Sequence, residues 1–366
     1  MKKCPYCDFN SHGTDGGEFP EQSYIDALIR DLKFESPRIR DREITSIFIG
    51  GGTPSLFSAS SLDQLLSAVR SHLKLASGIE ITLEANPGTL ESKRFESYRE
   101  LGINRISIGI QSFNDSMLKQ LGRIHDAQTA SNAIEIAKSA GFDRINIDLM
   151  FGLSGQSTQQ ALDDLTQGIE HHTSHLSWYQ LTIEPNTQFY KNPPVLPEDD
   201  TVFDIQQAGK ALLAQHGFIQ YEISAYALRG DRCKHNLNYW EFGDYLGLGA
   251  GAHGKITSSD EDAIYRYARH RIPERYMELA GQDNVIVEQK GLTENDLVLE
   301  FMMNNLRLTK GFSEPLFLER TGLSLELIED RINQAQSSGW IARNGTSIRP
   351  TNTGQNYLND LLQTFT

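Results

Sequence analysis

Hydrophobic residues along this chain follow two spacings in turn, one typical of helices and one of strands. Residues 21–35 place Tyr24, Ile25, Leu28, Ile29 and Leu32 on one stripe, which predicts an amphipathic helix. The predicted strands are 45–49, 79–85, 105–110, 144–150, 175–183 and 218–226, and the predicted helices among them are 62–73, 91–101 and 129–140. Alternating strands and helices are typical of a parallel sheet with right-handed crossovers. We therefore expect an α/β protein whose sheet closes into a complete or partial barrel.

The first repeat of this pattern is incomplete. A βα repeat opens with a strand, whereas this chain opens in a loop that leads into the helix at 21–35. We interpret the loop as the end of a truncated unit whose first strand is missing. The alternative is a barrel that starts with a helix.

The pattern changes after Tyr226. Residues 255–290 have no clear periodicity, and two or three helices follow from Thr293. Asn344-Gly345 between apolar flanks is typical of a hairpin. We therefore expect a barrel domain at 1–226, a connecting region at 227–290, and a small winged-helix-like domain at 291–366.

The charge of the chain limits its partners. The formal net charge is -14, and the C-terminal segment has no basic cluster, so we expect no nucleic-acid partner. No apolar run approaches the roughly 20 residues of a membrane helix, and the start lacks a signal-peptide pattern. We expect no transmembrane segment, and peripheral contact with a membrane partner stays open. The cysteines stand at positions 4, 7 and 233, too few for a disulfide framework, which favours the reducing cytosol.

Cys4 and Cys7 form a CxxC pair near the start, which is typical of a redox or soft-metal site. A thioredoxin-like site would place the first thiol at the start of a helix, but residues 10–20 form a polar stretch before the first helix. A zinc site through Cys4, Cys7 and His12 would need a fourth ligand. Two thiolates alone are too few to hold a four-iron cluster securely.

Cys4-Pro-Tyr-Cys7-Asp-Phe9 resembles the last two thirds of the CxxxCxxC motif of radical S-adenosylmethionine (SAM) proteins. The segment that continues through Asn10, Ser11 and His12 is similar to the heme-chaperone branch of the oxygen-independent coproporphyrinogen III oxidase family. The resemblance implies a partial radical SAM barrel, in which three thiolates hold a 4Fe-4S cluster and the fourth iron chelates SAM. The first cysteine of the motif would stand one residue before Met1. A start assigned too late would explain this, and the chain as given should bind a cluster poorly or not at all.

Gly50-Gly51-Gly52-Thr53-Pro54 follows the predicted strand at 45–49. The segment resembles the family's glycine-rich turn, which implies that Gly51, Gly52 and Thr53 approach the SAM amino group. Taken alone, three glycines after a strand are as typical of a tight turn.

Four polar residues match family positions that contact SAM, and they are Glu84, Gln111, Arg123 and Asp148. Three of them stand at the ends of predicted strands, at the rim where a parallel barrel gathers its ligand-binding groups. Each one singly could equally cap a helix or form a salt bridge. Together they fit a ligand with amino, carboxylate, ribose and sulfonium groups.

His235-Asn-Leu-Asn-Tyr239-Trp240 resembles the HNxxYW motif of the heme-chaperone branch, which implies a role for His235 in binding heme. A histidine ring nitrogen can ligate heme iron, and Tyr and Trp offer flat surface to a porphyrin. Cys233 is a second candidate ligand. The alternative is a hydrogen-bonded histidine beside a core tryptophan.

Residues 249–254 match GxGxxG, but no strand-to-helix context surrounds them. We therefore reject a dinucleotide site and expect these glycines to let the backbone approach a ligand.

The resemblance implies a cytosolic heme chaperone that binds heme and delivers it to respiratory-chain apoproteins, and we assign it no catalytic residue. The alternative is a coproporphyrinogen III dehydrogenase, in which a radical derived from SAM abstracts hydrogen from propionate side chains.

Overall fold

The computed structural model describes residues 3–11, 19–39, 42–89, 92–258 and 260–366, so that His12 lies outside the described residues. The chain divides into two compact units. Unit 1 comprises Met1–Ile29, Glu43–Gln220 and Ser224–Arg232, and unit 2 comprises Arg30–Arg42, Tyr221–Ile223 and Cys233–Thr366. Each unit is described by itself below. The predicted boundaries at residues 226 and 290 stay predictions.

Unit 1 is built on a sheet with the strand order β1-β2-β3-β4-β5-β7-β6. Five strands are parallel, namely β1 (Glu43–Ile49), β2 (Lys74–Ala85), β3 (Arg105–Gln111), β4 (Ile145–Phe151) and β5 (His175–Gln180). The single strand predicted at 218–226 is wrong, because the structure has β6 (Ile219–Glu222) and β7 (Ala225–Ala227) instead. Strand β7 runs antiparallel to β5, and the chain therefore turns back between the two short strands.

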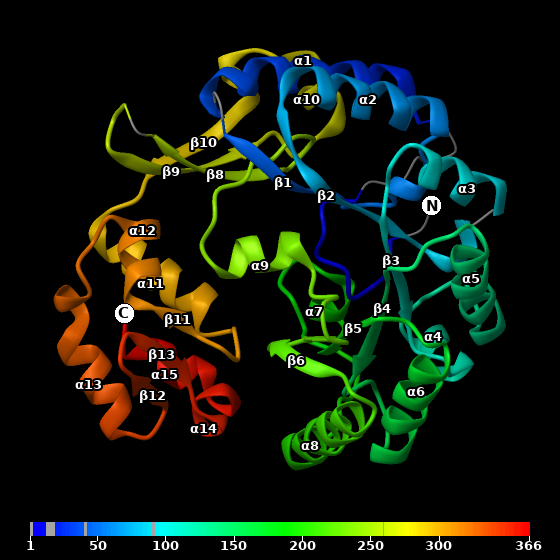
Figure 1. Ribbon diagram of the computed structural model, residues 1–366. Helices are drawn as coiled ribbons and strands as arrows, with labels where there is room; N and C mark the ends of the chain where they lie inside the picture. Colours follow the sequence, from blue (N-terminus) through cyan, green and yellow to red (C-terminus); the bar gives the residue numbers. More distant parts are fainter. Residues whose placement is uncertain (1–2, 12–18, 40–41, 90–91, 259) are drawn as a thin grey trace. The chain divides into compact units, whose positions relative to one another are not determined.

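Helices cover the outer face of this sheet (Figure 1). They are α2 (Ala59–His72), α3 (Ser92–Glu100), α5 (Ala127–Ser139), α6 (Thr158–Glu170) and α8 (Asp199–Gln215), and the shorter α4 (Asp115–Gln120) and α7 (Gln188–Lys191) lie in loops. Every second residue of a strand points its side chain into the core between the sheet and the helices, as Ile106, Ile108 and Ile110 do on β3. Gly102 and Gly141 follow α3 and α5 with φ of 90° and 85°, the left-handed conformation typical of a glycine after a helix end.

The alternate strand residues form a polar inner face. Glu84, Ser107, Asn146 and His175 are neighbours in register on four adjacent strands. Their side chains leave the sheet on the face opposite the apolar core, since successive strand residues alternate between faces. The α/β partial barrel predicted from the sequence is confirmed, and its inner face is polar where its outer face is apolar.

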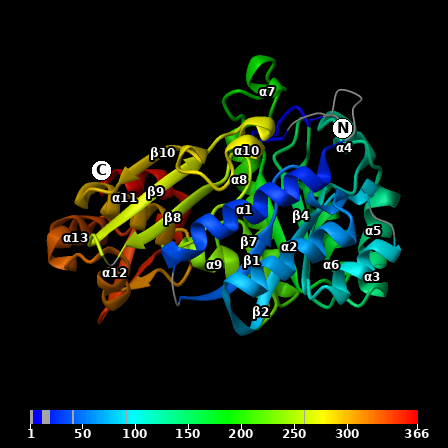
Figure 2. The same ribbon diagram turned by 90° about the horizontal axis from the view of Figure 1, so that it is seen from above.

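Unit 2 contains a three-stranded antiparallel sheet in the segment that the sequence left unassigned (Figure 2). Its order is β10-β9-β8, with β8 (His253–Ser258), β9 (Ala263–Arg269) and β10 (Ile286–Gly291), and helices α9 (Lys234–Trp240) and α10 (Pro273–Leu279) belong to the same unit.

Helix α1 (Glu21–Ile39) begins in unit 1 and ends in unit 2, where buried charges hold it. Arg269 lies 2.6 Å from Asp31 and 2.9 Å from Glu35, and all three side chains are fully buried. The hydroxyl of Tyr276 also donates to Asp31 at 2.8 Å.

The C-terminal part of unit 2 combines helices α11 (Glu294–Asn305), α12 (Glu314–Thr321), α13 (Glu329–Ser337), α14 (Asn352–Asn356) and α15 (Leu358–Gln363) with a small sheet. The sheet has the order β11-β13-β12, with β11 (Phe312–Ser313), β12 (Ile341–Asn344) and β13 (Ser347–Pro350). The predicted hairpin is confirmed. Its turn is Gly345-Thr346, one residue later than the Asn-Gly signal, because Asn344 pairs with Ser347 and Gly345 has φ of 59°.

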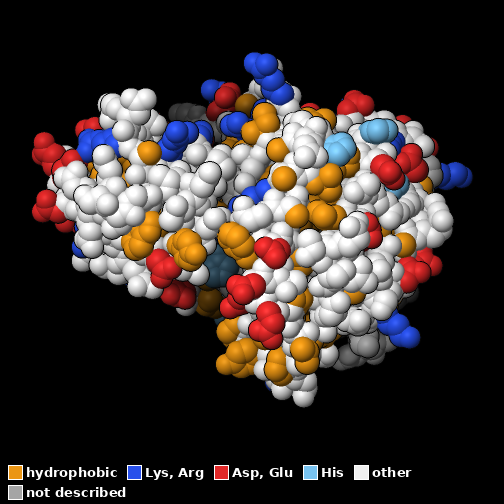
Figure 3. Space-filling model, turned by 90° about the horizontal axis from the view of Figure 1, so that it is seen from below, with side chains coloured by type: hydrophobic (Ala, Val, Ile, Leu, Met, Phe, Trp, Pro, Cys, Tyr) orange, Lys and Arg blue, Asp and Glu red, His pale blue; other side chains and the backbone are white. Residues whose placement is uncertain are grey.

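Acidic side chains are scattered among hydrophobic and neutral ones on the face drawn in Figure 3. Among the described helices, none combines the length and apolar character required to cross a membrane.

Candidate functional site

The cysteine loop at the start of the chain is held by contacts within unit 1. Within the loop, the Cys7 backbone N–H donates to the Cys4 carbonyl at 3.2 Å. Phe189 N–H donates to the Pro5 carbonyl at 3.0 Å, and Pro5 packs so closely on Gly122 that a Cβ there would lie 2.6 Å from the proline ring. The close contact requires a glycine at position 122, which also has φ of 71°.

Cys4 and Cys7 are both half-buried thiols. Burial raises the pKa of the Cys7 thiol, and the charge of Lys3 opposes this effect. The Cys4 sulfur lies 3.7 Å from Nη1 of Arg123, so that a cation stands beside the pair.

Arg123 connects the cysteine loop to the inner face of the sheet. Its Nη2 donates to Asn86 Oδ1 at 2.8 Å and to the Gly109 carbonyl at 2.7 Å. Asn86 in turn donates to the hydroxyl of Thr53 at 3.1 Å. A continuous polar chain therefore joins Cys4 to the glycine-rich turn after β1.

Glu84 stands near the end of β2, facing this glycine-rich turn. The Gly51 backbone N–H donates to its carboxylate at 3.0 Å. Burial, opposed by the Gly51 hydrogen bond and assisted by the charge of Asp148, raises the pKa of Glu84 to about 7. The carboxyl therefore titrates near neutral pH.

Asp148 lies on β4 within a polar network. Its carboxylate accepts from Asn146 Nδ2 at 2.7 Å and from the Ser107 hydroxyl at 3.2 Å. Burial raises the pKa of this carboxyl, while hydrogen bonds from Asn146, Ser177 and Ser107 oppose the rise. The Asn146 carbonyl accepts from His175 Nδ1 at 2.6 Å, which extends the network to β5.

Gln111 ends β3 with φ of 74°, a left-handed conformation that is uncommon for a residue other than glycine. The hydroxyl of Tyr179 donates to its side-chain carbonyl at 2.7 Å. Such strain is found mostly at sites that hold ligands, so Gln111 marks the rim as a candidate site.

The structure thus brings the sequence-predicted rim residues together on one unit. Carboxyls, an amide, a guanidinium and two thiols surround the same end of the half-barrel, a donor set suited to a soft metal and a ligand with amino and carboxylate groups. The sequence did not single out Asn86 or Tyr179. Asn86 had a signal, since it stands two residues after Glu84 and before a proline in the same strand end.

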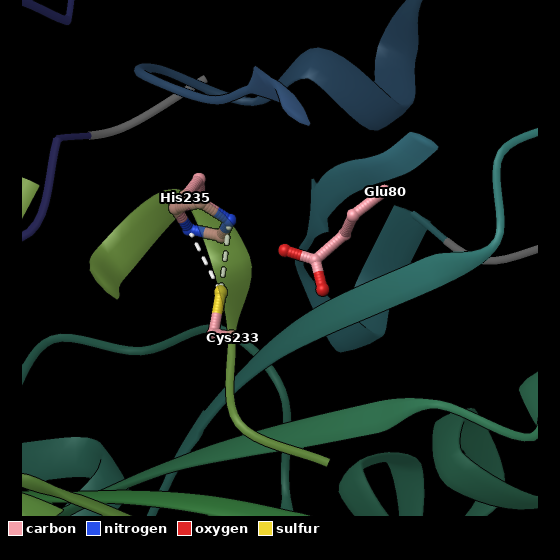
Figure 4. A group of neighbouring side chains, drawn as sticks. All are labelled: Glu80, Cys233 and His235. Atoms are coloured by element: carbon pink, nitrogen blue, oxygen red, sulfur yellow. Dashed lines mark hydrogen bonds between the residues drawn. The ribbon is translucent and has the colours of Figure 1, made fainter. Parts of the chain in front are cut away.

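His235 and Cys233 belong to unit 2, where Cys233 immediately precedes helix α9 (Figure 4). The Cys233 sulfur lies 2.9 Å from Nδ1 of His235 and 3.4 Å from Nε2. Both side chains are buried. Glu80, which the same figure draws, belongs to β2 of unit 1 and pairs there with Arg144 at 3.0 Å.

Comparison with known proteins agrees with this fold. The Radical SAM superfamily model matches residues 1–166, and the HemN C-terminal domain model matches residues 292–356. The heme chaperone HemW of Haemophilus influenzae is 47% identical over 369 residues, covering 100% of this chain and 95% of the relative. The heme chaperone HemW of Bacillus subtilis is 31% identical and covers 99% and 95%.

A solved structure of coproporphyrinogen III oxidase (HemN) from Escherichia coli, described as a radical SAM enzyme, has a TM-score of 0.82. The match covers 100% of this chain and 87% of the solved chain. Because the sequence identity is 21%, the match bears on the fold alone. The half-barrel with its C-terminal domain defines a protein of the radical SAM class. Within that class, the chain belongs to the HemW family.

Proposed function

We propose that this protein is a heme chaperone, which binds heme and delivers it to respiratory-chain apoproteins. The observation that carries the proposal is the 47% identity, along the whole chain, to a protein named heme chaperone HemW. Cys4, Cys7 and Cys233 are thiols, which fits a cytosolic setting. Delivery to respiratory-chain proteins brings the chaperone to the membrane surface as a peripheral partner.

We propose that the rim of the half-barrel is a site for SAM and a 4Fe-4S cluster, of which this chain holds two of the three thiolates, so that the cluster site is incomplete. Cys4 and Cys7 supply two thiolates of the kind that ligate such clusters, and the motif they resemble contains a third. When bound and reduced by an external electron donor, such a cluster would supply one electron to the sulfonium of SAM. The chain's own residues bind and orient the nucleotide, and the residues assigned to this role are Gly51, Gly52, Thr53, Glu84, Gln111, Arg123 and Asp148.

The charges at the rim support this assignment. Glu84 and Asp148 are two carboxyls whose pKa values burial raises, and each is costly to ionise without a nearby cation. SAM carries a positive sulfonium and an amino group, which would offset that cost. The carboxylate of SAM suits the guanidinium of Arg123.

Heme binding is tested by titrating the purified protein with hemin and following the Soret band. In a separate assay the protein receives coproporphyrinogen, SAM and a reductant under anaerobic conditions. Heme binding without turnover supports the chaperone, whereas formation of protoporphyrinogen without heme binding would favour the dehydrogenase. Transfer is then measured by mixing the heme-loaded protein with a respiratory apocytochrome.

Cluster binding is tested by anaerobic reconstitution with iron and sulfide. We expect a chain with Cys4→Ala and Cys7→Ala to bind less iron than the parent chain, and equal iron in the two would remove these thiols as ligands. For His235, a His235→Ala chain that keeps full heme affinity would remove that residue as a heme ligand.

A further inference from the structure

A pocket of about 400 Å³ lies within unit 2, beside the helix that carries the HNxxYW segment. Four aromatic side chains line it, namely Tyr239, Trp240, Phe242 and Tyr245. Small-molecule sites commonly have volumes of about 300–1,000 Å³ and mostly aromatic or apolar walls with a few polar groups. The pocket therefore suits a flat conjugated ligand.

The aromatic walls are held in place by one another and by the backbone. Tyr239 and Tyr245 pack edge to face with ring centres 4.7 Å apart. Phe242 has φ of 56°, a genuine outlier for a bulky residue, and its buried ring packs on Phe301 of the C-terminal core. Strained residues of this kind are concentrated at ligand sites.

Two cations of the pocket are fixed by neighbouring acceptors. Lys255 donates to the Phe242 carbonyl at 3.0 Å and to Asp244 at 2.8 Å. The ammonium also lies 4.2 Å from the centre of the Phe242 ring. An ammonium group has three N–H protons, so one N–H of Lys255 is left for that ring or for a ligand.

The second cation is Arg266. It donates to the Tyr245 hydroxyl at 2.6 Å and pairs with Glu300 through Nε at 2.8 Å and Nη2 at 2.6 Å. A guanidinium group has five N–H protons, so two remain after these three contacts. Lys255 and Arg266 are thus preorganised, and each retains donors for the carboxylates of a ligand.

His253 also lines the pocket, at the first position of β8, and its side chain is exposed. The glycines of the surrounding segment fix its backbone. A Cβ at Gly247 would lie 1.8 Å from the His253 carbonyl, and one at Gly254 would lie 2.0 Å from the Tyr267 ring. The glycine-rich segment therefore holds a histidine at the pocket.

His235 occupies a different place. It is absent from the described residues that line the pocket, and its ring meets that of Tyr239 edge to face at 6.5 Å. Its Nδ1 lies 2.9 Å from the Cys233 sulfur. His235 thus packs behind the wall that Tyr239 forms, where it positions that wall.

We propose that this pocket is the heme site, with His253 as the iron ligand, the four aromatic side chains against the porphyrin, and Lys255 and Arg266 at the propionates. This inference rests on the proposed function. A pocket of this volume covers part of a porphyrin and leaves an edge outside, which suits a carrier that hands heme on.

The iron ligand is tested with His253→Ala, and His235→Ala is measured for comparison. The matched control is His216→Ala, at an exposed histidine of unit 1. Each full-length chain is titrated with hemin. We expect His253→Ala to lose about tenfold in affinity and to shift the Soret band, with added imidazole restoring the spectrum. His216→Ala should bind like the parent chain, and His235→Ala, which removes a support of the Tyr239 wall, should keep the parent position of the Soret band. Unchanged binding by His253→Ala, while the parent chain binds heme, overturns the assignment. A parent chain that binds no heme instead overturns the proposed function.

The location of the heme site is tested with two substitutions at Asn304. Asn304→Trp fills the pocket, and Asn304→Ala is its matched control. Asn304 is partly exposed, and among the described residues its side chain donates to the Glu300 carbonyl of its own helix, so we expect both variants to fold, which circular dichroism checks. We expect Asn304→Trp to lose heme affinity about tenfold and Asn304→Ala to keep it. Parent-like binding by Asn304→Trp would place heme elsewhere. Loss in Asn304→Trp without loss in His253→Ala would keep the pocket and overturn the iron ligand.

Discussion

The guanidinium of Arg123 lies 3.7 Å from the sulfur of Cys4. The same group donates two hydrogen bonds to the inner face of the sheet, to Asn86 and to the Gly109 carbonyl. The side chain of Arg123 thus connects the sheet to Cys4, which stands 119 positions earlier in the sequence. Arg123 therefore fixes the place of the thiols at the rim as well as lining the rim itself.

Arg123→Lys should loosen the cysteine loop, because an ammonium cannot reproduce the planar fork of donors. We expect the free energy of unfolding to fall by about 1–3 kcal/mol in urea denaturation. We also expect iodoacetamide to modify Cys4 faster, as measured by mass spectrometry of the digested protein. Arg99→Lys, at an exposed arginine of α3, is the control and should change neither quantity. Parent-like alkylation of Cys4 in Arg123→Lys would show that Pro5 and Phe189 suffice to hold the loop.

Glu84 should make stability depend on pH. Its pKa is raised from 4.5 to about 7, so between these values the folded chain holds a proton that the unfolded chain has lost. The free energy of unfolding should therefore decrease as pH rises from about 4.5 to 7, by up to about 3 kcal/mol, and change little above that range.

Glu84→Gln should remove this contribution, since an amide does not titrate. Urea denaturation of both chains at several pH values measures the difference, and Glu100→Gln, at an exposed carboxyl, serves as the control. A difference between the Glu84→Gln and parent chains that stays constant from pH 4.5 to 7 would contradict the raised pKa.

The buried charges around α1 give a third prediction. Asp31→Asn leaves Arg269 and Glu35 buried beside a neutral partner, and breaking a buried ion pair costs about 3–5 kcal/mol. Urea denaturation should show a loss of this size, against less than about 0.5 kcal/mol for Asp26→Asn at a partly exposed position of the same helix. A small loss in Asp31→Asn would mean that Glu35 alone compensates Arg269.

The sequence could place Glu84 and Gln111 near one another because parallel strands end at one edge of a sheet. Glu84 and Gln111 stand at or next to the ends of β2 and β3, and the strand order follows the chain order from β1 to β5. Local patterns therefore sufficed to predict the half-barrel. The partners Asn86 and Tyr179 were missed because their hydrogen bonds join residues 37 and 68 positions apart, a distance that periodicity does not encode.

The sheet of unit 2 was missed for a different reason. Strand β10 is exposed along nearly its whole length, so it lacks the apolar alternation by which strands are recognised. The strand predicted at 218–226 failed because its apolar residues continue through a reversal, in which the Trp178 N–H donates to the Ser224 carbonyl at 2.7 Å. The pocket joins residues from 239 to 304, and only the folded chain brings His253 beside the aromatic residues of α9.

Gly254→Ala tests whether the glycine-rich segment holds His253 in place. A Cβ at this position would lie 2.0 Å from the ring of Tyr267, which is buried and accepts a hydrogen bond from the Gly247 N–H at 3.3 Å. Since neither backbone nor ring has room to yield, we expect a loss of about 1–3 kcal/mol in the free energy of unfolding. Heme affinity should fall as well, because the shift carries His253 with it.

The matched control is Gly88→Ala, since a Cβ there meets no atom within 4 Å and its φ is not positive. Gly88→Ala should change the free energy of unfolding by less than about 0.5 kcal/mol. If Gly254→Ala proved as stable as Gly88→Ala and bound heme like the parent chain, the Tyr267 ring would have room to move, and close packing at Gly254 would not be what positions His253.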